Sequence, residues 1–284
     1  MIADGLPLLL LTFAAALHAI WNALVKRANS SDPLFVWATS ALGTPIFVVL
    51  LGWWMVAHQG IETNWWAALV STVLHTTYAL VLQRAYKNAD MSTVYPTSRG
   101  VAPILVTIAA VGLGGAQPSL GVWVALPIVL AGVVLTTDLR AGRGGTGVGV
   151  RAGLLVAACT AAYTLWDSYA AQALAVDVVP YVALSSLAQV LLLTLAMHKR
   201  FREMPSVLIR SATTALPITI LAPLSYGLVY VAMQYAPPEM VATTRNLNIV
   251  FGVLAGVLLL RERPTRRAWI GTSVIVAGAL LASM

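Results

Sequence analysis

The sequence predicts an all-α integral membrane protein in which ten transmembrane helices form a 5+5 inverted-topology repeat around a central cavity. Three observations lead to this prediction: the composition, the spacing of the apolar segments and an internal repeat. Of 284 residues, 59% are hydrophobic and 10% are charged, whereas soluble domains carry roughly 25% charged residues. A water-soluble core of this size could not bury so much apolar surface, so we expect the chain to lie in a bilayer.

The apolar segments are the first element of the prediction, because about 20 apolar residues are needed to cross the hydrocarbon core. The first segment has no basic region before it and is longer than the apolar part of a signal peptide, so we expect it to be retained as a span. The third and eighth segments have polar residues in the middle, and the ninth follows the eighth across the short APPE sequence. The ten predicted spans are residues 5–26, 34–57, 65–85, 91–113, 119–138, 151–173, 179–198, 211–235, 238–260 and 266–283.

The positive charges alternate with the predicted spans. Lysine and arginine follow spans one, three, five, seven and nine, and the other loops and both termini contain none. By the positive-inside rule these five loops are cytoplasmic, so both termini are predicted to lie outside a bacterial-type cytoplasmic (inner) membrane. The scatter of the net charge of +7 over short loops argues against nucleic-acid binding. The loop cations are Lys26, Arg27, Arg84, Lys87, Arg140, Arg143, Arg151, Lys199, Arg200, Arg202, Arg210, Arg261, Arg263, Arg266 and Arg267.

An internal repeat relates the two halves of the chain at an offset of 145 to 148 residues. TYALV from Thr77 returns as SYGLV from Ser225, and Trp21-Asn22 corresponds to Trp166-Asp167. We expect repeats at residues 1–140 and 147–284, each with five spans, so the second enters the membrane inverted relative to the first. The alternative is an old duplication that is kept only for folding. Pro118, Trp123 and Gly132 keep their spacing in Pro264, Trp269 and Gly278.

These features together resemble the drug/metabolite transporter (DMT) superfamily, in particular its EamA-type ten-helix transporters. The resemblance implies that spans one to four and six to nine surround the cavity, with spans five and ten to the side. It also implies export or exchange of small metabolites by alternating access. Small multidrug members of the superfamily couple transport to protons through a glutamate in the first helix. This chain has no glutamate in spans one or six, where the matching residues are His18 and Asn22, then Tyr163 and Asp167.

Charged residues within the spans are candidates for function, because each costs about 3 kcal/mol or more at the bilayer centre. Asp167 and Arg245 both lie roughly 10 Å below the outer boundary at about 1.5 Å per residue, which predicts an ion pair. Asn22 and Arg99 lie at a similar depth below the inner boundary, which predicts a hydrogen bond. Both pairs are expected to flank the cavity. Alternatively, the residues of each pair only neutralise each other and fix the packing of their helices.

Helical spacing places further polar and aromatic residues on shared faces, three or four residues apart. Such faces suit a cavity better than lipid, although each tryptophan could instead anchor at the interface or pack. An imidazole can change charge near neutral pH, so His18 or His75 could carry protons, or simply form a buried hydrogen bond. The candidate cavity residues are His18, Trp21, Asn22, His75, Tyr78, Arg99, Tyr163, Trp166, Asp167, Tyr226, Tyr230, Arg245 and Asn246.

The predicted function is secondary active transport of a small metabolite. A cavity with aromatics, amides and both signs of charge suits an amino acid or similar zwitterion, an organic acid or an aromatic amphiphile. A passive facilitator or channel is the alternative. A polytopic enzyme is disfavoured because no HExxH, GxSxG or paired-carboxylate motif lies at a membrane surface, and the absence of a P-loop argues against primary pumping by this chain alone. No cofactor or metal is expected, and the single cysteine, Cys159, excludes an internal disulfide. The expected partners are the substrate and the lipid bilayer, and the chain is expected to be a monomer or a weak homodimer. Gly252 and Gly256 form a GxxxG motif that permits close helix contact inside the monomer or between monomers.

Overall fold

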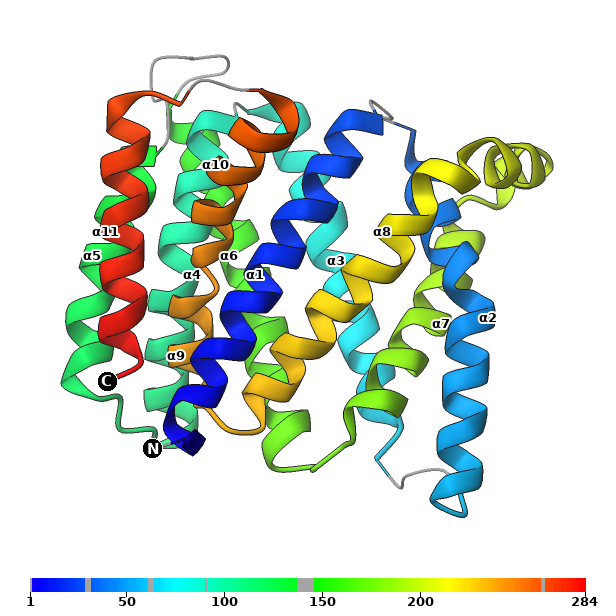
Figure 1. Ribbon diagram of the computed structural model, residues 1–284, viewed down its shortest axis with the longest axis horizontal. Coiled ribbons are helices and arrows are strands. Elements are labelled where there is room, and N and C mark those ends of the chain that lie inside the picture. Colours follow the sequence, from blue (N-terminus) through cyan, green and yellow to red (C-terminus); the bar gives the residue numbers. More distant parts are fainter. Residues whose placement is uncertain (1, 29–31, 61–63, 90, 137–145, 262–263) are drawn as a thin grey trace.

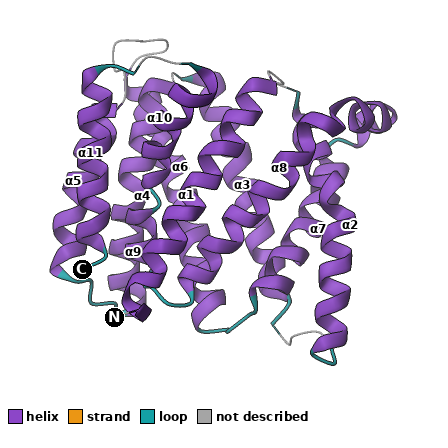
Figure 2. Ribbon diagram, viewed as in Figure 1, coloured by secondary structure: helices purple, strands orange, loops and turns teal. Residues whose placement is uncertain are grey.

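The computed structural model describes residues 2–28, 32–60, 64–89, 91–136, 146–261 and 264–284. Within these ranges all regular structure is helical, and each predicted span falls on helix (Figure 2). The elements are α1 (Ile2–Ala28), α2 (Pro33–Ala57), α3 (Trp66–Asn88), α4 (Met91–Gly114), α5 (Leu120–Thr136), α6 (Thr146–Gln172), α7 (Val178–Ala196), the 3₁₀-helix η1 (His198–Glu203), α8 (Met204–Met233), α9 (Pro238–Thr244), α10 (Leu247–Leu260) and α11 (Arg266–Ala282).

Seven helical stretches of the described residues are long and apolar enough to cross a membrane. α5 is apolar but shorter, and α3 and α11 are not among the seven. The outer surface carries large apolar side chains, such as Phe13, Val49 and Leu191, which are 59%, 69% and 66% exposed. A surface of this kind suits contact with lipid rather than water. The chain is therefore a multi-pass membrane protein.

The helix boundaries differ from the sequence prediction in three places. α6 begins at Thr146 and α8 at Met204, each several residues before the predicted start. The predicted span 238–260 is divided, since α9 ends at Thr244 and α10 begins at Leu247. At this division the backbone N–H groups of Asn246 and Asn248 bond the carbonyls three residues earlier. This tighter bonding interrupts the regular α-helix and is typical of a local hinge.

Helices from the two halves of the sequence interleave (Figure 1). α1 packs against α8 and α10, α6 packs against α3 and α4, and α2 and α3 both pack against α7. α5 and α11 pair at one edge of the molecule, and α2 and α7 pair at the other. Both termini lie at the same end of the molecule (Figure 1).

Glycines allow the α5–α11 pair to pack closely. A Cβ added to Gly271 would lie 2.7 Å from the carbonyl oxygen of Gly132, and one added to Gly278 would lie 2.5 Å from Cγ2 of Val129. At Gly132 an added Cβ would lie 3.0 Å from the carbonyl oxygen of Gly271. The glycines that the repeat conserves between its halves, Gly132 and Gly278, therefore both lie in this contact.

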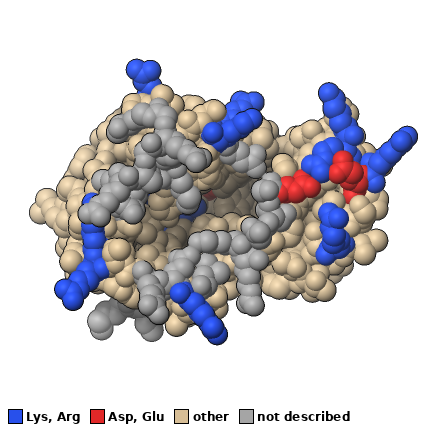
Figure 3. Space-filling view, turned by 90° about the horizontal axis from the view of Figure 1, so that it is seen from above, with Lys and Arg blue, Asp and Glu red and all other residues tan. Residues whose placement is uncertain are grey.

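Lysine and arginine side chains gather at the end opposite the termini, which we call the basic face (Figure 3). It is formed by the ends of α3, α6, α8, α10 and α11 and by η1. The predicted cations Arg140, Arg143 and Arg263, like the side chains of Lys26 and Arg27, lie outside the described residues. The described cations of this face are Arg84, Lys87, Arg151, Lys199, Arg200, Arg202, Arg210, Arg261, Arg266 and Arg267.

An ion-pair cluster on the basic face joins the start of α2 to η1. Arg200 donates to both carboxylate oxygens of Asp32, at 2.7 and 3.0 Å, and to both of Glu203, at 3.0 and 2.6 Å. Asp32 also caps α2 by accepting a 3.0 Å hydrogen bond from the N–H of Leu34. The hydrogen bonds from Arg200, and then the one from Leu34, lower the pKa of Asp32 below its usual value.

Candidate functional site

Two arginines meet at the division between α9 and α10. Arg245 and Asn246 occupy this division, and Arg99 on α4 faces the same small cavity. The cavity has a volume of about 20 Å³, which is room for about one water molecule. It is lined by Arg99, Ala102, Pro103, Thr160, Thr164, Ala242, Arg245 and Asn246, which come from α4, α6, α9 and the division itself.

Neither guanidinium of this cavity pairs with a carboxylate of the described residues. Among the described residues, no carboxylate oxygen lies within ion-pair distance of Arg99 or Arg245. Each instead lies near an aromatic ring, with Cζ of Arg99 5.7 Å from the ring centre of Tyr95 and Cζ of Arg245 5.6 Å from that of Tyr163. Cation–π contacts of this kind stabilise a partly desolvated arginine without neutralising it.

Further polar groups around the arginines lack hydrogen-bond partners within the described part of the chain. They include Nδ2 of Asn246 and Oγ1 of Thr164, both in side chains that are at least 97% buried. A buried donor without an acceptor costs about 1–3 kcal/mol. The cavity therefore presents donors from three residues, Arg99, Arg245 and Asn246, to anything that enters it.

A second polar cluster surrounds Asp167 on α6, which is fully buried. Its Oδ1 accepts hydrogen bonds from Ser71 at 2.7 Å and Tyr181 at 2.8 Å. Its Oδ2 accepts from Tyr226 at 2.9 Å and lies 2.9 Å from Nε2 of His75. Because a carboxylate only accepts, Nε2 of His75 carries a proton in this arrangement. We call these five residues the Asp167 cluster; it joins α3, α6, α7 and α8.

The predicted Asp167–Arg245 ion pair is wrong, because the four donors of the cluster occupy Asp167. Within the described residues the predicted Asn22–Arg99 hydrogen bond does not form. Nδ2 of Asn22 donates to the carbonyl oxygen of His18 at 2.7 Å, and the guanidinium of Arg99 lies near the ring of Tyr95 instead. Equal depth along two helices does not define rotation about their axes, and the prediction used depth alone. His75 and Tyr181, not arginine, point at the aspartate.

Aromatic rings connect the Asp167 cluster to the arginine cavity. The ring of His75 stacks on that of Tyr163 at 4.1 Å between centroids. Tyr163 in turn lies under Arg245 and meets Tyr78 edge-on at 5.3 Å. A continuous series of contacts thus runs from Asp167 through His75 and Tyr163 to Arg245.

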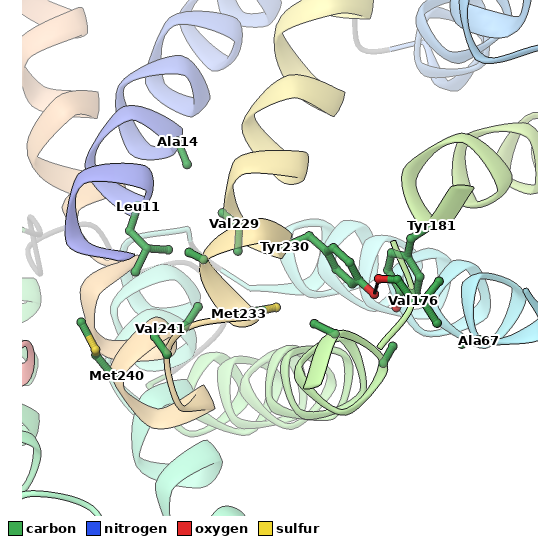
Figure 4. Close-up of a cluster of buried hydrophobic side chains, with 14 of the residues drawn as sticks. Leu11, Ala14, Ala67, Val176, Tyr181, Val229, Tyr230, Met233, Met240 and Val241 are labelled. Atoms are coloured by element: carbon green, nitrogen blue, oxygen red, sulfur yellow. Dashed lines mark hydrogen bonds between the residues drawn. The ribbon is translucent and has the colours of Figure 1, made fainter. Parts of the chain in front are cut away.

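Several predicted cavity residues lie in packing positions. Trp166 donates a 3.0 Å hydrogen bond to the carbonyl of Ala67, and its ring meets Trp66 and Tyr169. Tyr230 is fully buried, stacks on Tyr181 and donates to the carbonyl of Val176 at 3.0 Å (Figure 4). Trp21 packs against apolar residues of α2 and α8, and its Nε1 has no partner among the described residues.

A large apolar cluster closes the end of the molecule that lies opposite the basic face. It combines the first half of α1, the start of α3, the end of α6, the start of α7, the end of α8 and α9 (Figure 4). Gln172 ties this end together by donating to the carbonyls of Met233 and Ala236, at 2.7 and 2.8 Å. We call this apolar cluster the apolar plug. Its residues are Leu11, Ala14, Ala67, Ala68, Ala170, Ala171, Val176, Tyr181, Val229, Tyr230, Ala232, Met233, Ala236, Met240 and Val241.

The basic face is more open. Asn22 is exposed there, and His18 and Arg99 are partly exposed. Figure 3 shows a hollow near the middle of this face. The polar interior is therefore more exposed at the basic face than at the end that the apolar plug covers.

The sequence prediction missed Ser71 and Tyr181, the other two donors to Asp167, and Thr160 and Thr164 of the cavity. Ser71 could have been found, because it lies one helical turn before His75 and matches Thr219 at the repeat offset of 148. Thr160 and Thr164 are likewise spaced by four on the same helix as Asp167. Tyr181 gave no such signal, since its helix α7 was predicted without polar candidates.

A larger cavity of about 210 Å³ lies elsewhere and carries no ionisable group. It sits between α1, α10 and α11 and suits an apolar group rather than a polar solute. Its lining residues are Leu8, Thr12, Leu247, Val250, Phe251, Val276, Ala279 and Leu280.

Comparison with known proteins gives the fold and the family. A crystal structure described only as that of a protein aligns with a TM-score of 0.74, covering 98% of this chain and 98% of its own, at 19% identity. At that identity the likeness shows the fold alone. No curated protein matches the sequence. The model of the EamA-like transporter family matches twice, over residues 5–138 and 147–284. The two matches cover nearly the whole chain, which therefore belongs to the EamA-like transporter family, within the drug/metabolite transporter superfamily.

Proposed function

We propose that this protein is a secondary active transporter that moves a small metabolite across the cytoplasmic membrane by alternating access, as an exporter or exchanger. The observation that carries the proposal is the arginine cavity of this membrane protein. Among the described residues, its two guanidiniums have no ion-pair partner, and Nδ2 of Asn246 and Oγ1 of Thr164 have no hydrogen-bond partner. Polar groups at this depth are costly and usually serve a solute pathway. Their position at a divided helix agrees with the midplane sites of secondary transporters.

The proposed architecture is ten spans in two inverted repeats of five, 1–140 and 147–284. Two features support it. The family model matches each half separately. The packing also repeats between the halves, in which α1, α3 and α4 correspond to α6, α8 and α10. The contact of α1 with α8 has its counterpart in that of α6 with α3, and the contact of α1 with α10 has its counterpart in that of α6 with α4. A two-fold relation between the halves accounts for each pair.

We place the basic face in the cytoplasm and both termini outside, by the positive-inside rule. In this orientation the hollow of the basic face would open toward the cytoplasm, and the apolar plug and the Asp167 cluster would close the outer side. The arginine cavity holds about one water in this state, so a metabolite enters only when the surrounding helices separate.

The repeat suggests how the other state closes. Asn22, Tyr78 and Thr219 correspond to Asp167, Tyr226 and Ser71 at offsets of 145 and 148. In the outward-open state we expect these three to converge near the cytoplasmic side, while the Asp167 cluster separates. His75 has no polar counterpart, because Pro223 takes its place, so it is our candidate for a proton-coupling residue.

Counterflow in proteoliposomes tests the proposal. Vesicles loaded with an unlabelled solute that stabilises the purified protein should accumulate the labelled solute transiently. Arg245→Gln should abolish accumulation, whereas Arg84→Gln, on the exposed end of α3, should retain it. A passive facilitator would equilibrate the label without accumulation, and that result would replace the carrier mechanism.

A further inference from the structure

We propose that the arginine cavity binds a small organic anion through a carboxylate group and has no site for an ammonium group. The inference rests on the transport function proposed above and defines its substrate class. It favours carboxylates without an amino group over the amino acids and other zwitterions that the sequence alone left as candidates.

The two guanidiniums provide the attraction. Arg99 and Arg245 reach one cavity from different helices, and no described carboxylate pairs with either. Desolvating a cation without a counter-ion is unfavourable in a membrane interior, so a bound anion offsets a cost already present in the empty site. Arginine also matches a carboxylate geometrically, because its N–H groups can donate two parallel hydrogen bonds.

The unpaired neutral groups point to the same ligand. Nδ2 of Asn246 is a buried donor without a partner, and Oγ1 of Thr164 is a buried hydroxyl without one in the described residues. Both residues line the arginine cavity. A carboxylate has about four acceptor positions, so it can take hydrogen bonds from these groups as well as from an arginine.

The arrangement of Asp167 argues against an amino group. An ammonium inside the membrane requires a carboxylate or several free acceptors. Asp167 is fully buried, and its two oxygens are already within hydrogen-bond distance of four partners. At Asp167 an ammonium would have to displace one of these partners. Glu239 on α9 has a buried Oε2 without a partner in the described residues, but it is not one of the residues that line the arginine cavity. The remaining wall of the cavity consists of Ala102, Pro103, Ala242 and Thr160, whose hydroxyl donates to the carbonyl oxygen of Val156 at 2.9 Å. Three of these four residues are apolar and suit the carbon skeleton of a small acid.

Matched ligands that differ only in charged groups test this inference. One set is butanoate, alpha-aminobutanoate and propylamine, and another is hydrocinnamate, phenylalanine and phenethylamine. Binding to the purified protein in detergent is measured by the rise in melting temperature and by titration. We expect the carboxylate of at least one set to bind about tenfold or more tightly than its amino acid, and the amine not to bind.

Variants assign the binding to the cavity. Arg99→Gln and Arg245→Gln should each weaken carboxylate binding about tenfold or more, and Arg84→Gln should leave it unchanged. If a glutamine variant does not fold, the corresponding lysine variant keeps the charge but loses the bidentate geometry, and should bind more weakly than the parent protein.

The inference is overturned if the amino acid or amine of a set binds as tightly as the carboxylate, or if no carboxylate binds the folded parent protein. Binding is measured without transport, so the two proposals fail separately. Carboxylate binding with no counterflow would reject the carrier mechanism and keep the anion site. Counterflow that prefers amino acids would reject the anion site and keep the carrier.

Discussion

Asp167 is stabilised by hydrogen-bond partners on neighbouring helices. Four side chains from three other helices meet its two oxygens, and the aspartate has no contact with water. Hydrogen bonds to a charged acceptor contribute about 1.5–3 kcal/mol each. A cluster that joins α3, α6, α7 and α8 in this way holds one end of the molecule closed.

Tyr181→Phe should lower the free energy of unfolding by about 1–3 kcal/mol, because it removes one of the two donors to Oδ1 of Asp167. The change keeps the ring and its stacking on Tyr230. Thermal melting of the purified protein measures the effect. Tyr235→Phe is the matched control, since Tyr235 is 62% exposed. Equal melting temperatures for the two variants would contradict the role given to the cluster.

The pairing of Asp32 with Arg200 predicts a pH dependence of stability. Folding lowers the pKa of Asp32, so the pair stabilises the protein above the pKa of the unfolded chain, about 3.9, and is lost as the pH falls through the folded value. Arg200→Gln should therefore melt slightly below the parent protein at pH 7, and the difference should shrink below about pH 4. The effect is small because the pair is partly exposed.

The control for this measurement is Arg202→Gln, which changes an exposed cation of the same 3₁₀-helix. The difference in melting temperature between Arg202→Gln and the parent protein should not shrink as the pH falls. A difference between Arg200→Gln and the parent that stays constant from pH 7 to pH 3 would count against a contribution from Asp32.

Residue types and helical periodicity were enough to place His75, Tyr78, Tyr163 and Asp167 near one another before the structure was known. The partners of Asp167 were not predictable in this way. Contact between two helices depends on their rotation and separation, and a single sequence gives only depth. Trp166 and Tyr230 fit an aromatic cavity face equally well from spacing, and only packing shows that Trp166 lies against the apolar plug and Tyr230 within it.

At the scale of the helix, the close α5–α11 contact depends on residues without side chains. The repeat places a glycine at position 132 and again at 278, and each faces the partner helix. Gly271 adds a third close approach, in which backbone meets backbone. Small residues of this kind let membrane helices gain van der Waals contact.

Gly271→Ala should destabilise the protein, because the added Cβ would lie 2.7 Å from backbone atoms of Gly132 and Thr136 that cannot move independently. Overpacking typically costs about 1–3 kcal/mol. Gly252→Ala on α10 is the control, since nothing lies within 4 Å of its added Cβ. Thermal melting measures the stability of both variants. Equal melting temperatures for Gly271→Ala and Gly252→Ala would mean that α5 and α11 are not closely packed.

Sequence patterning located the helices well, because long apolar segments have few alternatives in a membrane. It did not predict the division at Arg245 and Asn246. Both residues keep right-handed helical dihedral angles. The division differs from a regular α-helix because backbone N–H groups bond the third preceding carbonyl rather than the fourth. That choice depends on the neighbouring helices, so no local sequence signal marks it.

At the scale of the whole molecule, the similar packing of the two halves supports the proposal that the chain alternates between two accessible states. The contacts α1–α8 and α6–α3 are counterparts in the repeat, but their polar residues differ. Asp167 is fully engaged, whereas its counterpart Asn22 is exposed. The offset in the sequence predicted the repeat. The side that is open in this state was not predictable, since it depends on a small energy difference between two similar packings.

Access of water to the arginine cavity is the most direct test of the account. In a Cys159→Ala background, Ala242→Cys places a thiol in the cavity and Val49→Cys places one on the lipid-facing surface of α2. A membrane-impermeant maleimide is applied from each side of the membrane. We predict labelling of Ala242→Cys from the basic face, slowed by a bound carboxylate, and no labelling of Val49→Cys. An Ala242→Cys protein that reacts from neither side, or no faster than Val49→Cys, would contradict a solute chamber between the two halves.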